Sequence, residues 1–351
     1  MKRNRHRPAG LSLTDLTVAS AAIGMLLVLG APAVNKGQAG VDVRRCQDNL
    51  RQLSMAQLTY ANVNGGFPPM ALAATALQYN QLHPNNPNLP GAEAPGGWFD
   101  GHGWYSLVGP YIGEPAWAAQ IDFSVSMSSL VNAPVRRGGL RLKTHACPSD
   151  IGMQRVDWAR DEWARVLSNY VVNAGNTNYG QSAIDAQQFL GAPFARGAIT
   201  PLISITDGLS STLLMSENVV LKGCTGWGGA FSDLQTALGG QMFTGFSRPN
   251  PAVADGIGYG RNGNGDCGTV AVMDARYQAA GVIPVPITVI GAQLGTRLSA
   301  RSKHVGGVNA SMCDGSVGFV ANTIDPAVWR ALSTSRGAGS GIPQEINPSV
   351  N

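Results

Sequence analysis

Charged residues are scarce in this chain of 351 amino acids: they make up 13%, about half the usual share in soluble domains. The net charge of +4 arises before Gly10, where four of the 25 basic residues cluster as Lys2, Arg3, Arg5 and Arg7. The rest of the chain has 21 basic residues against 21 acidic ones. With no basic surplus for binding phosphates, we expect no nucleic-acid partner. The basic cluster instead indicates the cytoplasmic flank of a membrane segment.

Local motifs for catalysis and metal binding are also missing. The five cysteines form no Cys-x-x-Cys pair and no Cys/His group with zinc spacing. We therefore expect no enzyme and no resident cofactor. In an exported chain one or two disulfides would form and leave one thiol free. A bond between Cys224 and Cys267, about 43 residues apart, is the pair we predict, and the alternatives are Cys147 with Cys313 or no bond at all.

Glycine is abundant at 45 residues, proline reaches 21, and hydrophobic residues make up 44%. The apolar share is enough for a core, and the length fits one large domain or two modest ones. Many Gly and Pro residues favour short strands, frequent turns and long loops. The Gly-rich tract 223–268 also carries aromatic residues, which either cover a small core or bind a glycan or a partner.

An apolar run from Leu11 to Val34 is roughly 24 residues long, enough to span a bilayer as a helix. It fits a secretory signal cleaved after Ala33, a plain membrane anchor, or a prepilin-type segment cleaved after Gly10. Asp15 is the only ionisable residue in the run, and a charge there needs a partner or a role. The simplest role is that of a carboxylate favoured by the dipole of a helix N-terminus.

A second helical stretch follows, with Val43, Cys46, Leu50 and Leu53 at spacings of three and four, and Tyr60 on the same stripe. The polar residues predicted on the other faces are Arg44, Arg45, Asp48, Arg51 and Gln52. Asn64-Gly65-Gly66 should end the helix, and Pro68-Pro69 forbids its continuation. We expect one helix over 11–66, kinked or broken at Pro32, Gly37 and Gly40.

Six sequence blocks then occur in order. They are Arg44–Leu53 with Phe67-Pro68-Pro69, Trp104-Tyr105 with Pro110-Tyr111, Cys147-Pro148-Ser149-Asp150, Asn169-Tyr170, Asp207-Gly208 with Glu217, and His304 followed after nine residues by Asp314-Gly315. Together they resemble a large bacterial family of unknown function, which pairs a prepilin-type leader with a C-terminal His-(nine residues)-Asp-Gly motif.

The resemblance implies a pilin-like fold, export and a location at the cell surface, with Gly10, Leu11 and Asp15 as the processing site. It also implies that Asp15 pairs with the N-terminal ammonium of a neighbouring subunit. The family usually has Glu at the position of Asp15 and Phe or Met at that of Leu11. Asp keeps the charge but has a shorter reach, which bears on assembly more than on processing.

The C-terminal block predicts a hairpin. Strands are expected near 308–313 and 316–321 around a type I′ turn at Asp314-Gly315. His304 and Asp314 could serve a hydrolase if they met, but Ser316 lies in no Gly-x-Ser-x-Gly elbow. The other interpretation is that His304 bonds loop backbone and holds the hairpin.

A calcium site is a further candidate, because Asn262, Asn264 and Asp266 alternate in a Gly-rich loop like part of a calcium-binding loop. No bidentate Glu follows at the right distance, and Asn and Gly also serve ordinary turns. We therefore predict no metal, with these three residues as the only calcium candidates.

The sequence thus predicts an α+β, pilin-like fold in which a long N-terminal transmembrane helix packs on an antiparallel β-sheet with a β-rich insertion. The segments expected are a leader (1–10), the helix (11–66), a body (67–325) with a loop-rich insert around 223–300, and a C-terminal tail (326–351). We expect a single-pass inner-membrane protein with its body in the periplasm or at the cell surface. Its partners would be a prepilin peptidase and other pilin-like subunits. The alternative is a membrane-anchored or periplasmic enzyme or carbohydrate-binding protein, with a pocket gathering His304, Asp207 and Glu217.

Overall fold

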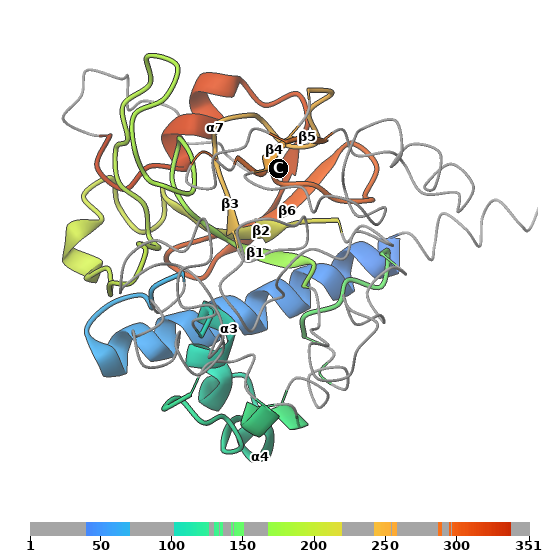
Figure 1. Ribbon diagram of the computed structural model, residues 1–351. Helices are drawn as coiled ribbons and strands as arrows, with labels where there is room; N and C mark the ends of the chain where they lie inside the picture. The colour runs from blue at the N-terminus through green and yellow to red at the C-terminus, as the bar shows by residue number, and fades with distance from the viewer. Residues whose placement is uncertain are drawn as a thin grey trace, which may run out of the picture.

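The computed structural model describes residues 40–70, 102–125, 168–219, 242–253 and 297–337, with shorter stretches at 130–132, 134–135, 142, 144–150, 255–257, 287–289 and 295. These residues form an α+β fold (Figure 1). A helix at 40–64 lies against one face of a five-stranded sheet, and α7 (Pro326–Leu332) lies against the other.

The helix at 40–64 buries the predicted stripe. Cys46, Leu50 and Leu53 have no exposed surface, and Tyr60 packs against the same core. The polar residues assigned to the other faces, from Arg44 to Gln52, are exposed. The helix ends at Gly65, whose φ of +82° is readily adopted only by glycine. Among the described residues no helix is both long and apolar enough to cross a membrane, and the span expected at 11–34 lies outside them.

The five-stranded sheet has the order β3-β1-β2-β6-β7. Its strands are β1 (Tyr170–Asn173), β2 (Leu213–Glu217), β3 (Met242–Phe243), β6 (Gly307–Met312) and β7 (Val317–Ala321). The prediction of a purely antiparallel sheet is wrong, because β3 pairs parallel to β1 while the other pairs are antiparallel. A parallel pair needs a long connection, and the chain between β1 and β3 supplies it by passing through β2.

Alternation along the strands separates two parts of the core. Tyr170 and Val172 of β1 face the helix at 40–64, whereas Val171 between them faces α7. In β6, Val308 and Ala310 pack with Trp329 of α7. This period of two matches a sheet that is covered on both faces.

The predicted C-terminal hairpin is confirmed, since β6 and β7 pair antiparallel with Ser311 opposite Val317. The predicted type I′ turn is wrong. Gly315 donates its N–H to the Met312 carbonyl and has a φ of +87°, whereas Asp314 does not have positive φ. The connection is therefore a tight turn centred on Cys313 and Asp314, followed by a glycine in the left-handed region. Cys313, Asp314 and Gly315 thus form a three-residue loop in which Gly315 is the left-handed residue.

Residues 326–337, part of the segment expected as a tail, include α7. Asp325 caps its first turn by accepting hydrogen bonds from the N–H groups of Ala327 and Val328. Trp329 is fully buried against the sheet. The other short helices are α3 (Trp104–Val108), η1 (Gly109–Tyr111), α4 (Pro115–Ala118), η2 (Leu130–Asn132) and η4 (Leu202–Ser204).

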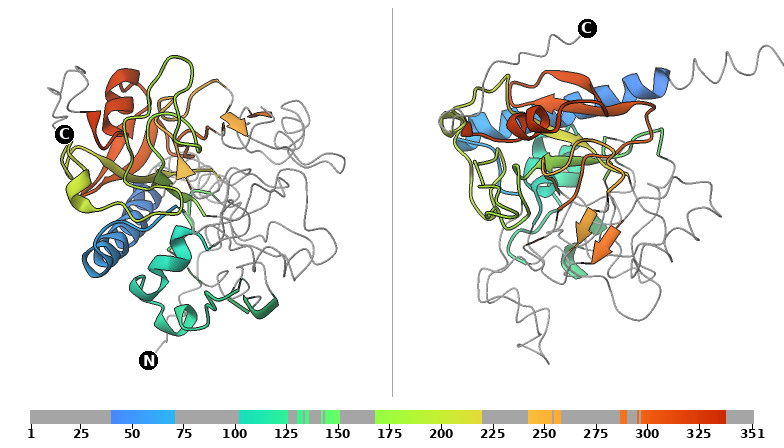
Figure 2. Two further views of the ribbon diagram at one scale, coloured as in Figure 1. Left: turned by 60° about the vertical axis from the view of Figure 1, so that its left-hand side comes forward. Right: turned by 90° about the horizontal axis from the view of Figure 1, so that it is seen from above.

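The predicted insert around 223–300 is described only in part. It contributes β3 to the main sheet and a separate parallel pair, β4 (Asp255–Ile257) with β5 (Ile287–Val289). This pair lies away from the five-stranded sheet (Figure 2).

Candidate functional site

A disulfide joins the helix at 40–64 to the loop at 144–150. It links Cys46 to Cys147, which are 101 positions apart, with their Cα atoms at 5.2 Å. Cys313 is buried and carries no disulfide, so the alternative pairing of Cys147 with Cys313 is wrong. The predicted partners Cys224 and Cys267 lie outside the described residues.

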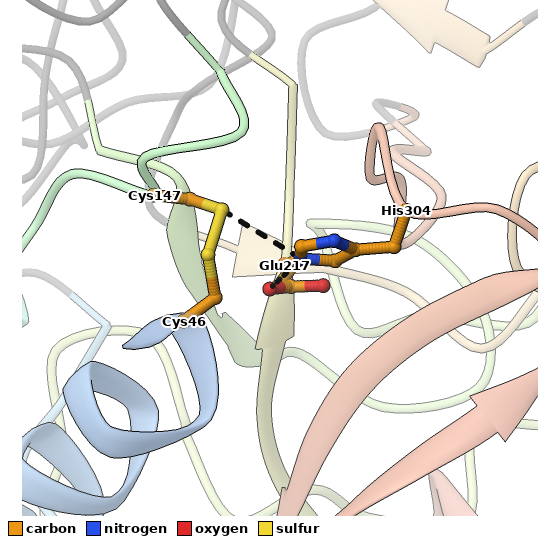
Figure 3. Close-up of side chains that lie close together, drawn as sticks. All are labelled: Cys46, Cys147, Glu217 and His304. Carbon is orange, nitrogen blue, oxygen red and sulfur yellow. Dashed lines mark hydrogen bonds and ion pairs between the residues drawn. A yellow bond between two sulfur atoms is a disulfide. The ribbon is translucent and has the colours of Figure 1, made fainter. Parts of the chain in front are cut away.

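A histidine and a carboxylate lie beside this disulfide. His304, in the loop before β6, places Nε2 at 3.1 Å from Glu217 Oε1 and at 3.7 Å from Cys147 Sγ. Glu217 is the last residue of β2, and both side chains are almost fully buried. Figure 3 shows the imidazole directed at the sulfur and the carboxylate together. We refer to Cys46, Cys147, Glu217 and His304 as the Cys-Glu-His cluster.

Asn309 of β6 holds the carboxylate in place. Its backbone N–H donates to Glu217 Oε2 at 2.8 Å, and its side-chain amide donates to Oε1 at 2.9 Å. Gln47, next to Cys46 on the helix, donates in turn to the Asn309 side-chain oxygen at 3.0 Å. Glu217 therefore accepts three hydrogen bonds from protein groups, which offset much of the cost of burying a carboxylate.

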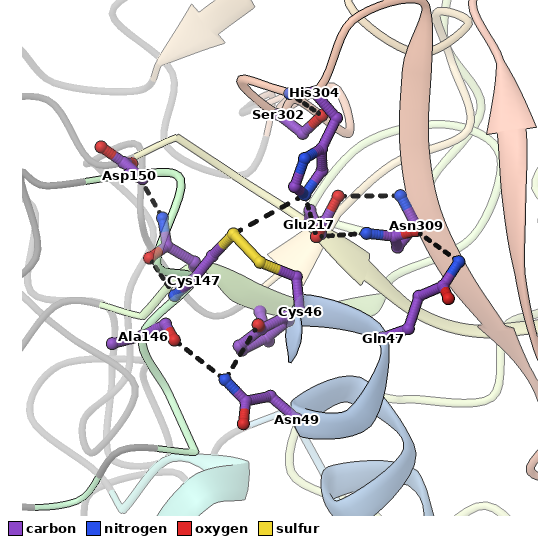
Figure 4. The surroundings of a disulfide bond; sticks show 12 residues. Cys46, Gln47, Asn49, Ala146, Cys147, Asp150, Glu217, Ser302, His304 and Asn309 are labelled. Atoms are coloured by element: carbon purple, nitrogen blue, oxygen red, sulfur yellow. Dashed lines mark hydrogen bonds and ion pairs between the residues drawn. A yellow bond between two sulfur atoms is a disulfide. The ribbon is translucent and has the colours of Figure 1, made fainter. Parts of the chain in front are cut away.

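The remaining neighbours lie in or directly beside the sequence blocks named above (Figure 4). The Asn169 side chain accepts from the Cys147 N–H and donates to Asp150. Asp150 forms an ion pair of 2.8 Å with Lys303, the residue before His304. Asn49 of the helix donates to the Ala146 carbonyl at 2.9 Å. Five blocks that are distant in the sequence thus converge on one buried site, since Glu217 belongs to the block that begins at Asp207-Gly208.

Burial sets the electrostatics around the cluster. Burial raises the pKa of Tyr170 well above its usual value, and the negative charge of Glu217 acts in the same direction. Burial lowers the pKa of His145, two residues before Cys147, to about 4. Water therefore has little access to this region, and the charges within it are poorly screened.

The His-(nine residues)-Asp-Gly motif does not bring its own residues together. His304 precedes β6 and Asp314 follows it, so the six-residue strand separates them by roughly 20 Å. At the tip, Asp314 Oδ1 accepts from the backbone N–H and the hydroxyl of Ser316, at 2.9 and 2.7 Å. The hypothetical hydrolase pair of His304 with Asp314 is therefore wrong. The nine residues between them are instead two loop residues, the six residues of β6 and Cys313 of the turn.

The interpretation that His304 bonds loop backbone is also wrong for its side chain, which contacts Glu217 and Cys147. Asp207 is not part of the cluster. Its carboxylate accepts from the Thr334 hydroxyl and the Gly337 N–H, and so it anchors the segment after α7. Gly208 beside it has a φ of +95°. Of the pocket considered from sequence, only His304 and Glu217 lie together.

Several predicted site residues lie outside the described residues, so the structure does not place them. They are Gly10, Leu11 and Asp15 of the processing site, and the calcium candidates Asn262, Asn264 and Asp266.

Sequence reasoning did not identify Cys46 or Asn309 as site residues, and it named Glu217 only in the alternative pocket with His304 and Asp207. Cys46 matched the helix stripe as an apolar residue, and Glu217 was part of the block that begins at Asp207-Gly208. The one available signal was that Cys46, Glu217 and Asn309 lie within the same series of blocks as Cys147 and His304. The four ligand-type atoms of the Cys-Glu-His cluster all lie within 4.8 Å of one another, a proximity that only the fold creates.

Comparison with known proteins finds a family model described as "Protein of unknown function (DUF1559)", which matches residues 44–327. All the residues of the cluster fall within this range. No curated protein matches the chain, and neither does any solved structure.

Proposed function

This chain belongs to the family of unknown function DUF1559, and we propose that it is an exported, membrane-anchored, pilin-like or pseudopilin-like protein of the cell envelope. Its role would be structural or in interactions rather than enzymatic. The prepilin-type pattern at Gly10, Leu11 and Asp15 supports anchoring by the N-terminal helix. Its body would lie in the periplasm or at the cell surface, and its partners would be a prepilin peptidase and other pilin-like subunits.

The observation that carries this proposal is the buried disulfide between Cys46 and Cys147. Structural disulfides persist in exported proteins and are rare in the cytoplasm. This one fastens the helix at 40–64 to the body near the helix's N-terminal end, where the chain would emerge from a membrane. A force applied to the membrane segment would then be transmitted to the body through a covalent bond as well as through helix packing.

The arrangement of the fold also supports the proposal. One long helix lies along a sheet and contributes its apolar stripe to the core. Polar pairs reinforce this contact, because Ser54 donates to the Ser311 hydroxyl at 2.7 Å and Gln47 donates to Asn309. A helix fixed in this way can transmit the position of a membrane anchor to the whole body.

A second candidate function is that of a membrane-anchored or periplasmic enzyme or carbohydrate-binding protein. The contact between His304 and Glu217 favours it, since a histidine oriented by a carboxylate is a common catalytic pair. Against it, both side chains are buried and Asp207 lies elsewhere. We therefore place the pair in the structural support of the hairpin.

Trapping of thiols in whole cells tests the proposal. Cells that produce the full chain are acid-quenched, and free cysteines are alkylated before and after reduction. The expected result is a Cys46–Cys147 peptide that is oxidised in the full chain and reduced in a matched chain that lacks residues 1–34 and stays in the cytoplasm. Export would be contradicted by a full chain whose Cys46 and Cys147 are alkylated without prior reduction.

A further inference from the structure

We propose that the Cys-Glu-His cluster binds one zinc-like divalent cation when Cys46 and Cys147 are reduced, so that disulfide and metal are alternative states of one site. The inference does not depend on whether the chain is pilin-like. It rests on four side chains from four separate segments, whose ligand-type atoms all lie within 4.8 Å of one another.

The donor set suits a borderline-soft cation. Two thiolates, one imidazole nitrogen and one carboxylate oxygen are the ligand types of protein zinc sites. Among the described residues the cluster offers one carboxylate, whereas calcium and magnesium prefer six or more oxygen ligands.

The distances fit as well as the donor types do. In a tetrahedral site with Zn–S of about 2.3 Å and Zn–N or Zn–O of about 2.0–2.1 Å, neighbouring ligand atoms lie roughly 3.3–3.8 Å apart. Cys147 Sγ is 3.7 Å from His304 Nε2, which in turn is 3.1 Å from Glu217 Oε1. These two edges are close to those of a tetrahedron before any cation enters. The sulfur–sulfur edge opens when the disulfide is reduced.

Outer contacts already hold the ligands in position. Asn309 fixes the carboxylate through both oxygens, and the Ser302 hydroxyl accepts from the His304 backbone N–H at 3.1 Å. The Asn169 side chain fixes the Cys147 backbone at 2.9 Å. Metal sites generally depend on such second contacts to orient their ligands.

The negative charges of the ligands also favour a divalent cation. When the cation is bound, two thiolates and the Glu217 carboxylate place three negative charges in a buried region, which the cation must neutralise. A divalent cation leaves a net charge of −1, and the N–H donors of Asn309 partly offset it. All four ligands belong to the protein and are buried, so the site has the closed character of a structural metal site.

The two states interconvert by thiol–disulfide exchange together with metal binding. A dithiol reductant reduces the Cys46–Cys147 bond to two thiols and is itself oxidised to a disulfide. The cation then binds both sulfurs and the two thiol protons are released. Oxidation by a disulfide or another two-electron oxidant re-forms the bond and expels the cation.

Cobalt(II) is the probe, because sulfur-bound tetrahedral cobalt gives sulfur-to-metal absorption in the near ultraviolet and intense visible bands. The full chain is prepared in detergent with Cys224→Ser, Cys267→Ser and Cys313→Ala, so that the cluster retains the only cysteines. After reduction with a phosphine, which binds metals weakly, it is titrated with Co²⁺. The expected result is both sets of bands, saturating at one equivalent and lost when Zn²⁺ is added. The oxidised sample of the same protein should give none.

Variants identify the other two ligands. His304→Ala and Glu217→Gln should each weaken Co²⁺ binding at least tenfold and shift the visible bands. His102→Gln removes a buried histidine outside the cluster and should change neither. Near-ultraviolet circular dichroism of each metal-free variant checks its fold. The comparison of reduced with oxidised protein uses no variant of His304 or Glu217, so it tests the proposal even if such a variant misfolds. The proposal is overturned if the reduced protein shows no sulfur-to-cobalt absorption, or if binding is unchanged in both His304→Ala and Glu217→Gln.

Discussion

Asn309 binds the carboxylate of Glu217 with two N–H groups, one from its backbone and one from its side chain, at 2.8 and 2.9 Å. Replacing Asn309 by Ala removes one donor to a buried carboxylate and should lower the free energy of unfolding by about 1–3 kcal/mol. Asn309→Asp should cost more at pH 8 than at pH 5, because two buried carboxylates repel each other until one is protonated. Urea unfolding at the two pH values measures both effects. A pH-independent loss for Asn309→Asp, equal to that for Asn309→Ala, would contradict this account of the contact.

The Cys46–Cys147 disulfide should be a major contributor to stability. It closes a loop of about 100 residues, for which the chain-entropy model gives about 4–5 kcal/mol. We expect the Cys46→Ser, Cys147→Ser double variant to unfold at markedly lower denaturant concentration than the oxidised chain in the presence of a chelator. Adding a reductant should lower the denaturant midpoint of the wild-type chain to that of the double variant and should leave the midpoint of the variant unchanged. Equal midpoints for the oxidised chain and the double variant would refute the prediction.

His145 should make the protein acid-sensitive. Burial lowers its pKa to about 4 from an ordinary value of 6.5, so the unfolded chain binds the proton more readily than the folded one does. The contribution of His145 to the free energy of unfolding is therefore fully present above about pH 6.5. It is lost as the pH falls towards 4, by on the order of 3 kcal/mol. His145→Gln should flatten that part of the curve of unfolding free energy against pH. If the wild type and the variant have parallel curves between pH 7 and 4, His145 does not cause the loss.

The turn at Asp314 should matter for the hairpin although its side chain is exposed. Asp314→Val removes the acceptor for two hydrogen bonds from Ser316 and should destabilise the protein by about 1 kcal/mol. Asp314→Asn keeps a side-chain oxygen at that position and is the matched control, with a smaller expected loss. Thermal unfolding of the two variants in parallel makes the comparison. Equal losses for Asn and Val would show that the charge, and not the local hydrogen bonds, is what counts.

Local patterns in the sequence predicted the local structure well. The three-and-four spacing of Cys46, Leu50 and Leu53 predicted the buried face of the helix, because side-chain direction follows the helical period. Alternation around Asp314-Gly315 predicted both strands of the hairpin. The turn type was missed because an Asp-Gly pair fits two kinds of tight turn, and the strand register decides between them.

The site could not be derived in the same way. Cys46 pairs with Cys147 across 101 positions, and nothing in the spacing of five cysteines specifies which of them meet. Glu217 and His304 come together only because β2 and β6, which are far apart in the chain, are neighbours in the sheet. The parallel pairing of β3 with β1 was missed for the same reason, since strand order is a property of the whole fold.

The mass of the mature N-terminus in native membranes tests the central claim most directly. If the chain is a processed pilin-like protein, its first residue is Leu11, with or without a methyl group, and a bulky substitution at Gly10 abolishes the cleavage. The helix then stays attached and the protein remains in the membrane fraction. A mature N-terminus at Val34 that is unaffected by the Gly10 substitution would show removal of the apolar segment by signal peptidase, and would contradict the pilin-like account.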